Sequence, residues 1–349
     1  MNPENQPLVS IIVPVYNVEN YLYKNLANLQ DQKYTNFEII YVNDGSTDSS
    51  AQTLIELENL DPRVRVSVQK NCGTGMARNN GVENARGEFI YFMDPDDTID
   101  SQLLIDNVKE IIEKKADVLV FDFDSVDNNG NIVETRSFKH LANMNSVGKI
   151  VSNFTELYEM GVFNTVWHKI FRRDFIQKHN IISPTWSNAQ DRGFLLRVAS
   201  HNPRIFFNRS DKKYYHYMVA RNGSSTAVYR HNLTTIFIKS SQEVSHTLSV
   251  LGGQTTSRLQ YLIYIKDLYL NVFINTGRKK APQSVNGKLM VINKVYDFED
   301  FYMYLHTVKL FDLSLTLKEN IIVIIAKYRL TILLLIWQKI KKKLNYTKK

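Results

Sequence analysis

The sequence is poor in cysteine, with Cys72 alone among 349 residues. One thiol cannot form an internal disulfide, so a disulfide-stapled extracellular fold is excluded and a cytoplasmic location is favoured. The first seven residues are polar and lead into no apolar stretch of the signal type, so we predict no secretory signal. The sequence also lacks internal repeats and low-complexity segments, which excludes solenoid and fibrous architectures.

Most of the chain carries no excess charge of either sign. The formal net charge is +8, but eight lysines and arginines and no acidic residue follow residue 320. The first 320 residues are balanced, with 35 basic and 35 acidic side chains. We therefore predict no nucleic-acid partner for the body of the chain, and the positive charge belongs to its tail.

Strand-like and helix-like segments alternate through the first 125 residues. Short apolar runs predict strands, and apolar positions three or four residues apart predict helices. The predicted strands are 8–15, 37–42, 64–68, 88–93 and 117–121. The predicted helices are 18–29, 51–57 and 101–114, and 73–84 is predicted to be a loop that enters a short helix. This alternation predicts an α/β fold, with a mostly parallel, Rossmann-like sheet flanked by helices on both faces.

Polar clusters follow three of these strands. Tyr16 and Asn17 follow the first, Asp44 follows the second, and an acidic turn at 94–97 (DPDD) follows the fourth. Ligands of such sheets bind beyond the carboxyl ends of the strands, so the clusters should converge on one crevice. Asp44 could accept hydrogen bonds from a base or ribose there, or could merely cap the next helix.

The acidic turn contains a D-x-D pair, Asp94 and Asp96, which could hold a hard divalent cation such as Mg²⁺ or Mn²⁺. Such a pair on its own is more often a solvated turn or a helix cap, and its place at a strand end strengthens the metal interpretation. A second D-x-D pair, Asp122 and Asp124, is interpreted as strand-end surface residues.

Five ordered segments together are more specific than any single one. They are 9–17 (VSIIVPVYN), 43–48 (NDGSTD), 77–81 (ARNNG), 87–90 (GEFI) and 94–97 (DPDD). In order and spacing the chain resembles the family-2 glycosyltransferases, inverting enzymes with the GT-A fold. The resemblance is close over roughly the first 120 residues and looser to about residue 228.

The resemblance implies a nucleotide-sugar donor, usually a uridine diphosphate sugar, and a divalent cation, Mn²⁺ or Mg²⁺. The residues implied to bind the nucleotide sugar are Pro14, Tyr16, Asn17, Asp44, Arg78 and Asp94. Asp96 is implied to be the main metal ligand. A cation there would neutralise charge that develops on the departing nucleoside diphosphate.

The family also implies a catalytic base after a Trp-x-Lys segment. Here that segment is Trp167 to Lys169, and both residues are expected to contact the acceptor, although Trp167 could equally be core. The base is implied to be Asp191, which deprotonates the acceptor hydroxyl. The family's preceding glutamate is Gln190 here, a departure that puts fine tuning of the base in doubt; Asp191 could alternatively be only a helix cap.

Arg221 and Ser224 are implied to contact the diphosphate. Arginine suits bidentate phosphate binding, although a bland surface loop is nearly as good an interpretation of this segment. The Gln-x-x-Arg-Trp motif of processive polysaccharide synthases is absent, which favours transfer of one sugar per acceptor.

We predict four parts of the chain: a nucleotide-sugar-binding half (1–125), an acceptor-binding half (126–230), a helical extension (231–320) and a basic amphipathic tail (321–349). The tail is apolar but interrupted by charge, so it does not suit a spanning helix. On a helical wheel Asn320, Lys327, Thr331 and Gln338 share one side, which favours a helix lying in the membrane interface. The alternative is a buried helix with a solvated basic end.

These observations predict an inverting glycosyltransferase, peripheral on the inner face of the cell membrane. Its acceptor would be a saccharide or a lipid-linked molecule of bacterial surface polysaccharide synthesis. The main rival is a phosphatase of the haloacid dehalogenase type, because Asp94 to Thr98 also spells D-x-D-x-T. A nucleotidyltransferase or an inactive adaptor is less favoured, and the missing G-x-G-x-x-G disfavours a dinucleotide-binding oxidoreductase.

Overall fold

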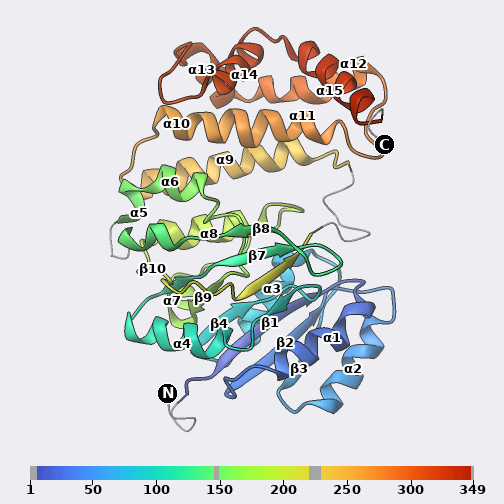
Figure 1. Cartoon of the computed structure of the whole chain (residues 1–349), viewed down its shortest axis with the longest axis vertical. Coiled ribbons are helices and arrows are strands. Elements are labelled where there is room, and N and C mark those ends of the chain that lie inside the picture. The colour runs from blue at the N-terminus through green and yellow to red at the C-terminus, as the bar shows by residue number, and fades with distance from the viewer. Residues whose placement is uncertain (1–5, 145–148, 220–228, 347–349) are drawn as a thin grey trace. The chain divides into compact units, whose positions relative to one another are not determined.

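The computed structural model describes residues 6–144, 149–219 and 229–346. The chain forms two compact units. The first comprises Met1–Asn222 with Val250–Gly252, and the second comprises Gly223–Ser249 with Gly253–Lys349. Figure 1 shows the sheets in the part of the chain coloured blue to yellow and the helical unit in yellow-orange to red.

A seven-stranded sheet forms the centre of the first unit, in the order β10-β6-β9-β4-β1-β2-β3. Its strands are β1 (Val9–Val15), β2 (Phe37–Asn43), β3 (Val64–Val68), β4 (Phe89–Phe92), β6 (Val118–Val120), β9 (Lys169–Arg172) and β10 (Ile205–Phe207). Neighbours among β3, β2, β1 and β4 are parallel, as are β6 and β10. The predicted mostly parallel sheet is therefore confirmed.

One strand of this sheet was not predicted. β9 lies between β4 and β6 and runs antiparallel to both. It consists of four residues only, too few for a periodic pattern to identify. Its insertion separates β4 and β6, although these two are successive strands of the sheet along the sequence.

Helices cover both faces of the sheet because side chains alternate along β1. Ile11 and Val13 belong to the core shared with α1 (Glu19–Gln30), α2 (Ser50–Leu60) and α4 (Leu103–Glu113). Ile12 faces the opposite way, against α3 (Thr74–Asn84), where a Cβ on Gly81 would lie 2.3 Å from its Cγ2 atom. On that same face Phe194 of α8 (Gln190–Ser200) packs edge-on against Phe92.

A smaller sheet of four strands, in the order β5-β11-β7-β8, completes the first unit. The strands are β5 (Thr98–Ile99), β7 (Phe123–Val126), β8 (Ile132–Arg136) and β11 (Tyr215–Met218). The remaining helices of this unit are short: α5 (Lys149–Ser152), α6 (Phe154–Glu159) and α7 (Arg173–Lys178). The aromatic run at 214–217, for which no element was predicted, supplies β11.

The described part of the second unit is helical, which confirms the predicted C-terminal extension. Its helices are α9 (Leu233–Val250), α10 (Ser257–Gln260), α11 (Asn271–Asn275), α12 (Val285–Asn293), α13 (Glu299–Thr307), α14 (Leu317–Lys327) and α15 (Thr331–Tyr346). A π-helical segment, Tyr261–Leu270, joins α10 to α11. None of the helices described combines the length and the apolar content that crossing a bilayer requires.

The tail contains two helices where one was expected. Arg329 lies between α14 and α15 with a left-handed φ of 53°, which breaks the helical path. Asn320 and Thr331, expected on a polar surface, are buried. The predicted single helix with an outward polar side is therefore wrong for this part of the chain.

Candidate functional site

The predicted polar clusters lie at the carboxyl ends of adjacent strands. Val15 of β1 pairs with Asn43 of β2, so Tyr16 and Asp44 leave the sheet side by side. Pro14 is buried within β1, whereas the Tyr16 ring directly after it is exposed. An exposed aromatic ring at this edge of a parallel sheet is in the position where such folds bind their ligands.

Asn17 joins the turn after β1 to the turn after β2. It adopts a left-handed φ of 53°, which asparagine tolerates better than most residues. Its side-chain oxygen accepts a hydrogen bond from the Thr47 backbone N–H at 2.7 Å, and its own N–H donates to Ser46 Oγ at 3.2 Å. Asn17 thus holds the turn after β1 and the turn after β2 together at the edge of the sheet.

Asp44 is buried and organises the loop that leads into α3. Its Oδ1 atom accepts hydrogen bonds from Gln69 Nε2 and the Cys72 N–H, and its Oδ2 atom accepts one from the Gly73 N–H, each at 2.8 Å. With these three donors the Asp44 side chain fixes the shape of the loop. If Asp44 also contacts a nucleotide, as the sequence predicts, that contact is additional to its structural role in the loop.

Arg78 of α3 connects two carboxylates that lie far apart in the sequence. Its Nη2 atom donates to Asp94 at 2.9 Å and its Nη1 atom donates to Asp191 at 2.5 Å. Arg78 as a whole is only 5% exposed; burial opposes the charge of its side chain, but the two carboxylates outweigh burial and raise its pKa. Arg78 therefore joins the acidic turn to the predicted base in one network.

Asp97 and Tyr215, whose roles were not predicted, hold the acidic turn in place through hydrogen bonds. Buried Asp97 accepts hydrogen bonds from the Tyr215 hydroxyl at 2.5 Å and from the Met218 N–H at 2.7 Å. The Tyr215 hydroxyl also accepts one from the Asp94 N–H at 3.4 Å. In the sequence Asp97 stands only in an acidic run and Tyr215 only in an aromatic run. Their contact could not be predicted because it arises from the sheet that brings β11 to this turn.

The turn concentrates negative charge. Burial raises the pKa of Asp94, with smaller contributions from Asp191 and Asp96, while Arg78 opposes the rise. Burial, then Asp94 and Asp96, raise the pKa of Asp97 well above its usual range. Asp96, the predicted metal ligand, is half-buried in this turn. One arginine does not balance these carboxylates, so the turn is suited to receiving a cation.

Asp191 lies in the first turn of α8, where the helix dipole favours a carboxylate. Its second oxygen accepts a hydrogen bond from the Val166 N–H at 3.2 Å. Asn79 of α3 exchanges two hydrogen bonds with the Ser183 backbone, which tethers the segment leading to α8. Gln190 packs against the α3 entry loop, within 3.8 Å of where a Cβ on Gly73 would lie. Here Gln190 serves as a contact between the two segments.

Trp167 and Lys169 are not accessible to an acceptor. Trp167 is 4% exposed and stacks on Tyr215, with ring centroids 4.4 Å apart. Lys169 is 1% exposed; its ammonium donates to the Thr165 carbonyl and contacts His168 Nε2, both at 2.7 Å. Burial lowers the pKa of Lys169 strongly. The prediction that Trp167 and Lys169 contact the acceptor directly is therefore wrong. Both side chains belong to the interior that supports the site.

The second D-x-D pair is also corrected, because Asp122 and Asp124 are buried rather than on the surface. Asp122 accepts hydrogen bonds from the Phe138 N–H at 2.7 Å and from Lys213 Nζ at 2.8 Å. Asp124 accepts one from Thr135 Oγ1 at 2.6 Å. These carboxylates are satisfied structural acceptors of the smaller sheet.

Two predicted diphosphate contacts, Arg221 and Ser224, lie outside the described residues. Within the residues that are described, no three histidine, cysteine or acidic side chains are grouped closely enough to hold a metal ion by themselves.

Comparison with known proteins identifies the class of this unit. Residues 10–179 match the model of the family described as Glycosyl transferase family 2. The chain is 37% identical over 172 residues to glycosyltransferase GlyA of Streptococcus pneumoniae serotype 4, covering 47% of this chain and 24% of GlyA. It is 32% identical over 218 residues to the poly(ribitol-phosphate) beta-N-acetylglucosaminyltransferase TarS of Staphylococcus aureus strain MW2, covering 61% of this chain and 36% of TarS.

Solved structures of Staphylococcus aureus TarS share the fold. Residues 1–349 of TarS, in complex with UDP-GlcNAc, align with a TM-score of 0.53 and 24% identity, covering 86% of this chain and 75% of that one. A longer TarS structure aligns with a TM-score of 0.61 and 22% identity, covering 92% and 54%. The first unit therefore has the GT-A fold. Through residues 10–179 the chain belongs to glycosyl transferase family 2, and the phosphatase alternative is set aside.

Proposed function

We propose that the chain is an inverting glycosyltransferase that moves one sugar from a uridine diphosphate sugar to a hydroxyl group of its acceptor. The observation that carries this proposal is the Arg78 network. It joins Asp94, on the turn where a donor would bind, to Asp191, the candidate base, through hydrogen bonds of 2.9 and 2.5 Å. Donor binding and deprotonation of the acceptor can therefore occur in one place.

The carboxylates of the acidic turn fit a bound Mg²⁺ or Mn²⁺. Such ions are usually held by one or two carboxylates together with substrate phosphates and water, so the carboxylates of this turn could supply the protein's share. Asp96, with Asp94 beside it, would hold the ion. When bound, the ion stabilises negative charge on the departing nucleoside diphosphate.

Arg78 also offers a donor for the diphosphate. Its Nε atom is buried and has no hydrogen-bond partner among the described residues, which is costly for a charged group. A phosphate oxygen that reached this N–H would remove that cost. The proposed binding of the nucleotide by Pro14, Tyr16, Asn17 and Asp44 is supported by their position along the carboxyl edge of β1 and β2.

The transfer step needs a base on the acceptor side. The acceptor O–H bond breaks as Asp191 takes the proton, the oxygen bonds to the anomeric carbon, and the bond from that carbon to the diphosphate oxygen breaks. The hydrogen bond from the Val166 N–H holds the Asp191 carboxylate in place during this step. Attack from the face opposite the leaving group inverts the anomeric centre.

The acceptor is proposed from the relatives. TarS is a poly(ribitol-phosphate) beta-N-acetylglucosaminyltransferase, and one of its structures contains UDP-GlcNAc. The chain spans about a quarter of GlyA and about a third of TarS, so its own acceptor is inferred by class alone. We propose a saccharide or lipid-linked acceptor of bacterial surface polysaccharide synthesis, modified at the inner face of the cell membrane.

The test is the Asp191→Asn variant, with release of UDP from UDP-GlcNAc and other UDP-sugars followed in the presence of acceptor. Loss of a general base costs about 10²- to 10⁴-fold in rate, whereas UDP binding should be unchanged. Asp174→Asn is the matched control, because Asp174 is an exposed carboxylate in the first turn of α7. Transfer by Asp191→Asn at the unmodified rate would show that the base is wrongly assigned.

A further inference from the structure

Each of the two C-terminal helices has one polar residue buried inside the unit and large apolar residues exposed outside it. Asn320 of α14 is buried, and its amide nitrogen donates to the carbonyls of Asp312, Leu315 and Thr316 at 3.1–3.2 Å. Thr331 of α15 is 1% exposed, and its hydroxyl is bonded to the Tyr269 hydroxyl at 2.7 Å. These two polar side chains thus face the interior of the unit, among buried apolar ones.

The outward side of these helices is correspondingly apolar. On α14 the exposed residues include Leu317, at 70%, and Ile321 one turn further on. On α15 Ile332 and Ile336, and beside them Leu333 and Trp337, form two adjacent rows with four-residue spacing. Ile336 is 49% exposed and Trp337 is 57% exposed. Four large apolar side chains in adjacent rows on α15 indicate a binding surface rather than chance exposure.

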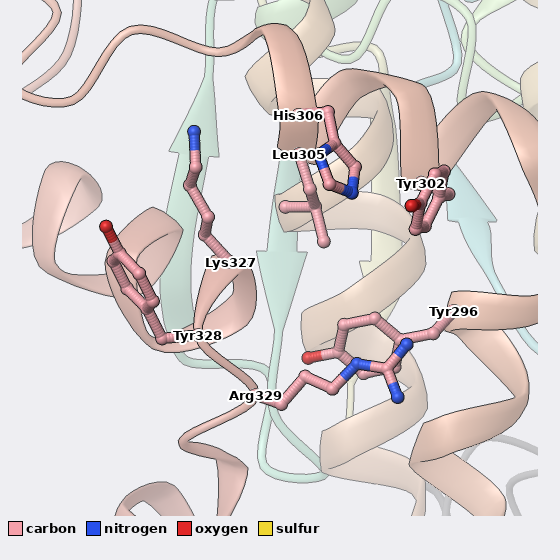
Figure 2. Close-up of a pocket in the computed structure, with 7 residues that line it drawn as sticks. All are labelled: Tyr296, Tyr302, Leu305, His306, Lys327, Tyr328 and Arg329. Atoms are coloured by element: carbon pink, nitrogen blue, oxygen red, sulfur yellow. The ribbon is translucent and has the colours of Figure 1, made fainter.

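A basic hollow lies where α14 meets α15. Figure 2 shows this cavity of about 210 Å³, lined by Tyr296, Tyr302, Leu305, His306, Lys327, Tyr328 and Arg329. The Arg329 guanidinium lies over the Tyr296 ring, 4.7 Å from its centroid. These lining residues comprise two cationic side chains, a histidine, three tyrosines and a leucine, with no carboxylate among them. Such a lining is suited to an anionic group.

The sequence continues this charge. Eight lysines and arginines and no acidic residue follow Asn320. An apolar surface followed along the chain by positive charge alone fits the surface of an anionic bilayer, where Trp and Tyr rings occupy the headgroup region and basic residues meet lipid phosphate. A second copy of the chain fits less well, because a two-fold contact would place the same positive surface against itself.

We propose that the outward face of α14 and α15 is a docking surface for anionic lipid, and that the basic hollow at their junction takes a lipid phosphate. The α14–α15 face means here Leu317, Ile321, Ile332, Leu333, Ile336 and Trp337. This inference deepens the proposed function by specifying how the chain binds the membrane. The surface lies within the second unit and its use requires no sugar transfer.

The apolar contribution is tested by sedimentation of the full chain with two kinds of vesicle. One contains phosphatidylcholine alone, and the other contains about 30% phosphatidylglycerol as the anionic lipid. We expect binding to the anionic vesicles only. The double variant Ile336→Ser with Trp337→Ser should bind them at least about tenfold less tightly. The matched control is Ile55→Ser with Leu60→Ser on α2, at residues that are 54% and 62% exposed.

The basic hollow is tested with Arg329→Gln, and Arg86→Gln on the first unit serves as its control because that side chain is 66% exposed. Arg329→Gln should weaken binding to anionic vesicles several-fold. Added inorganic phosphate should compete only at concentrations that also screen charge, whereas competition at micromolar phosphate would show a site for free phosphate and overturn the lipid assignment.

Light scattering of the same variants decides between lipid and a second copy. A monomer that binds anionic vesicles through the α14–α15 face supports the proposal. A dimer that Ile336→Ser with Trp337→Ser converts to monomer, with no vesicle binding in either form, would overturn it. Ile332→Ser with Leu333→Ser is a second variant for the same test. None of these experiments measures sugar transfer. A negative result would therefore refute the lipid-docking proposal without affecting the proposed reaction, and a loss of transfer activity alone would not affect the docking proposal.

Discussion

Replacement of Arg78 by methionine tests whether one buried cation holds the site together. Methionine retains much of the volume of the arginine stem but removes both hydrogen bonds, to Asp94 and to Asp191. The carboxylates of Asp94 and Asp191, which share the Arg78 guanidinium, would then face each other with no cation between them. The pKa of Asp94, already raised by burial, should rise further because Arg78 is what lowers it.

The size of the effect follows from burial. Removing one partner of a buried ion pair costs about 3–5 kcal/mol. Here the arginine side chain is 6% exposed, but the carboxylates of Asp94 and Asp191 are 29% and 18% exposed and can be partly rehydrated. We therefore expect a loss of about 3 kcal/mol, which for a unit of this size lowers the unfolding midpoint by roughly 6–12 °C.

The assay is thermal unfolding followed by circular dichroism, together with UDP binding by calorimetry. Arg78→Lys should recover only part of the loss, because one ammonium cannot reproduce two separate guanidinium contacts. Arg86→Met, on an exposed side chain 4.0 Å from Glu38, should change stability by less than about 0.5 kcal/mol. If Arg78→Met melted within 2 °C of the unmodified chain, at about 1 kcal/mol or less, the argument from the buried network would fail.

Two further changes test the fold around the site. Gly81→Ala would place a Cβ 2.3 Å from Ile12 Cγ2, so overpacking between α3 and β1 should cost about 1–3 kcal/mol by urea unfolding, whereas a neutral result would show that the contact is loose. Hydrogen bonds from Arg63, chiefly, lower the pKa of Asp61, and a lowered carboxyl pKa adds stability above about pH 4 that is lost as the pH falls. Asp61→Asn should therefore cost about 1.5–3 kcal/mol at pH 7 and less below pH 4; an equal cost at both pH values would contradict this linkage.

Much of the first unit could be predicted from the sequence because its signals are local. Runs such as 9–15 and 37–43 are buried along their whole length, and apolar spacing indicates the helices between them. The rule that parallel strands gather their carboxyl ends placed Tyr16, Asp44 and Asp94 at one edge of the sheet. The expected region of the site therefore follows from period and connectivity alone.

The contacts that define the site could not be predicted in this way. Arg78 and Asp191 are 113 residues apart, and the strand β9 that lies between β4 and β6 has no periodic signature. Trp167 and Lys169 illustrate the same limit, since a polar or aromatic residue in a motif gives no sign of its burial. The tail was misjudged because amphipathic spacing shows that a helix has two sides but not which side faces the interior.

The proposed reaction requires the acidic turn to bind a nucleotide sugar through a divalent cation. The measurement is release of UDP from a panel of UDP-sugars with Mn²⁺ or Mg²⁺, comparing the unmodified chain with Asp96→Ala and with added chelator. We expect release from at least one donor, its loss in Asp96→Ala and on chelation, and its return when the metal is restored. Release that persists undiminished in Asp96→Ala and in the presence of chelator would contradict the account.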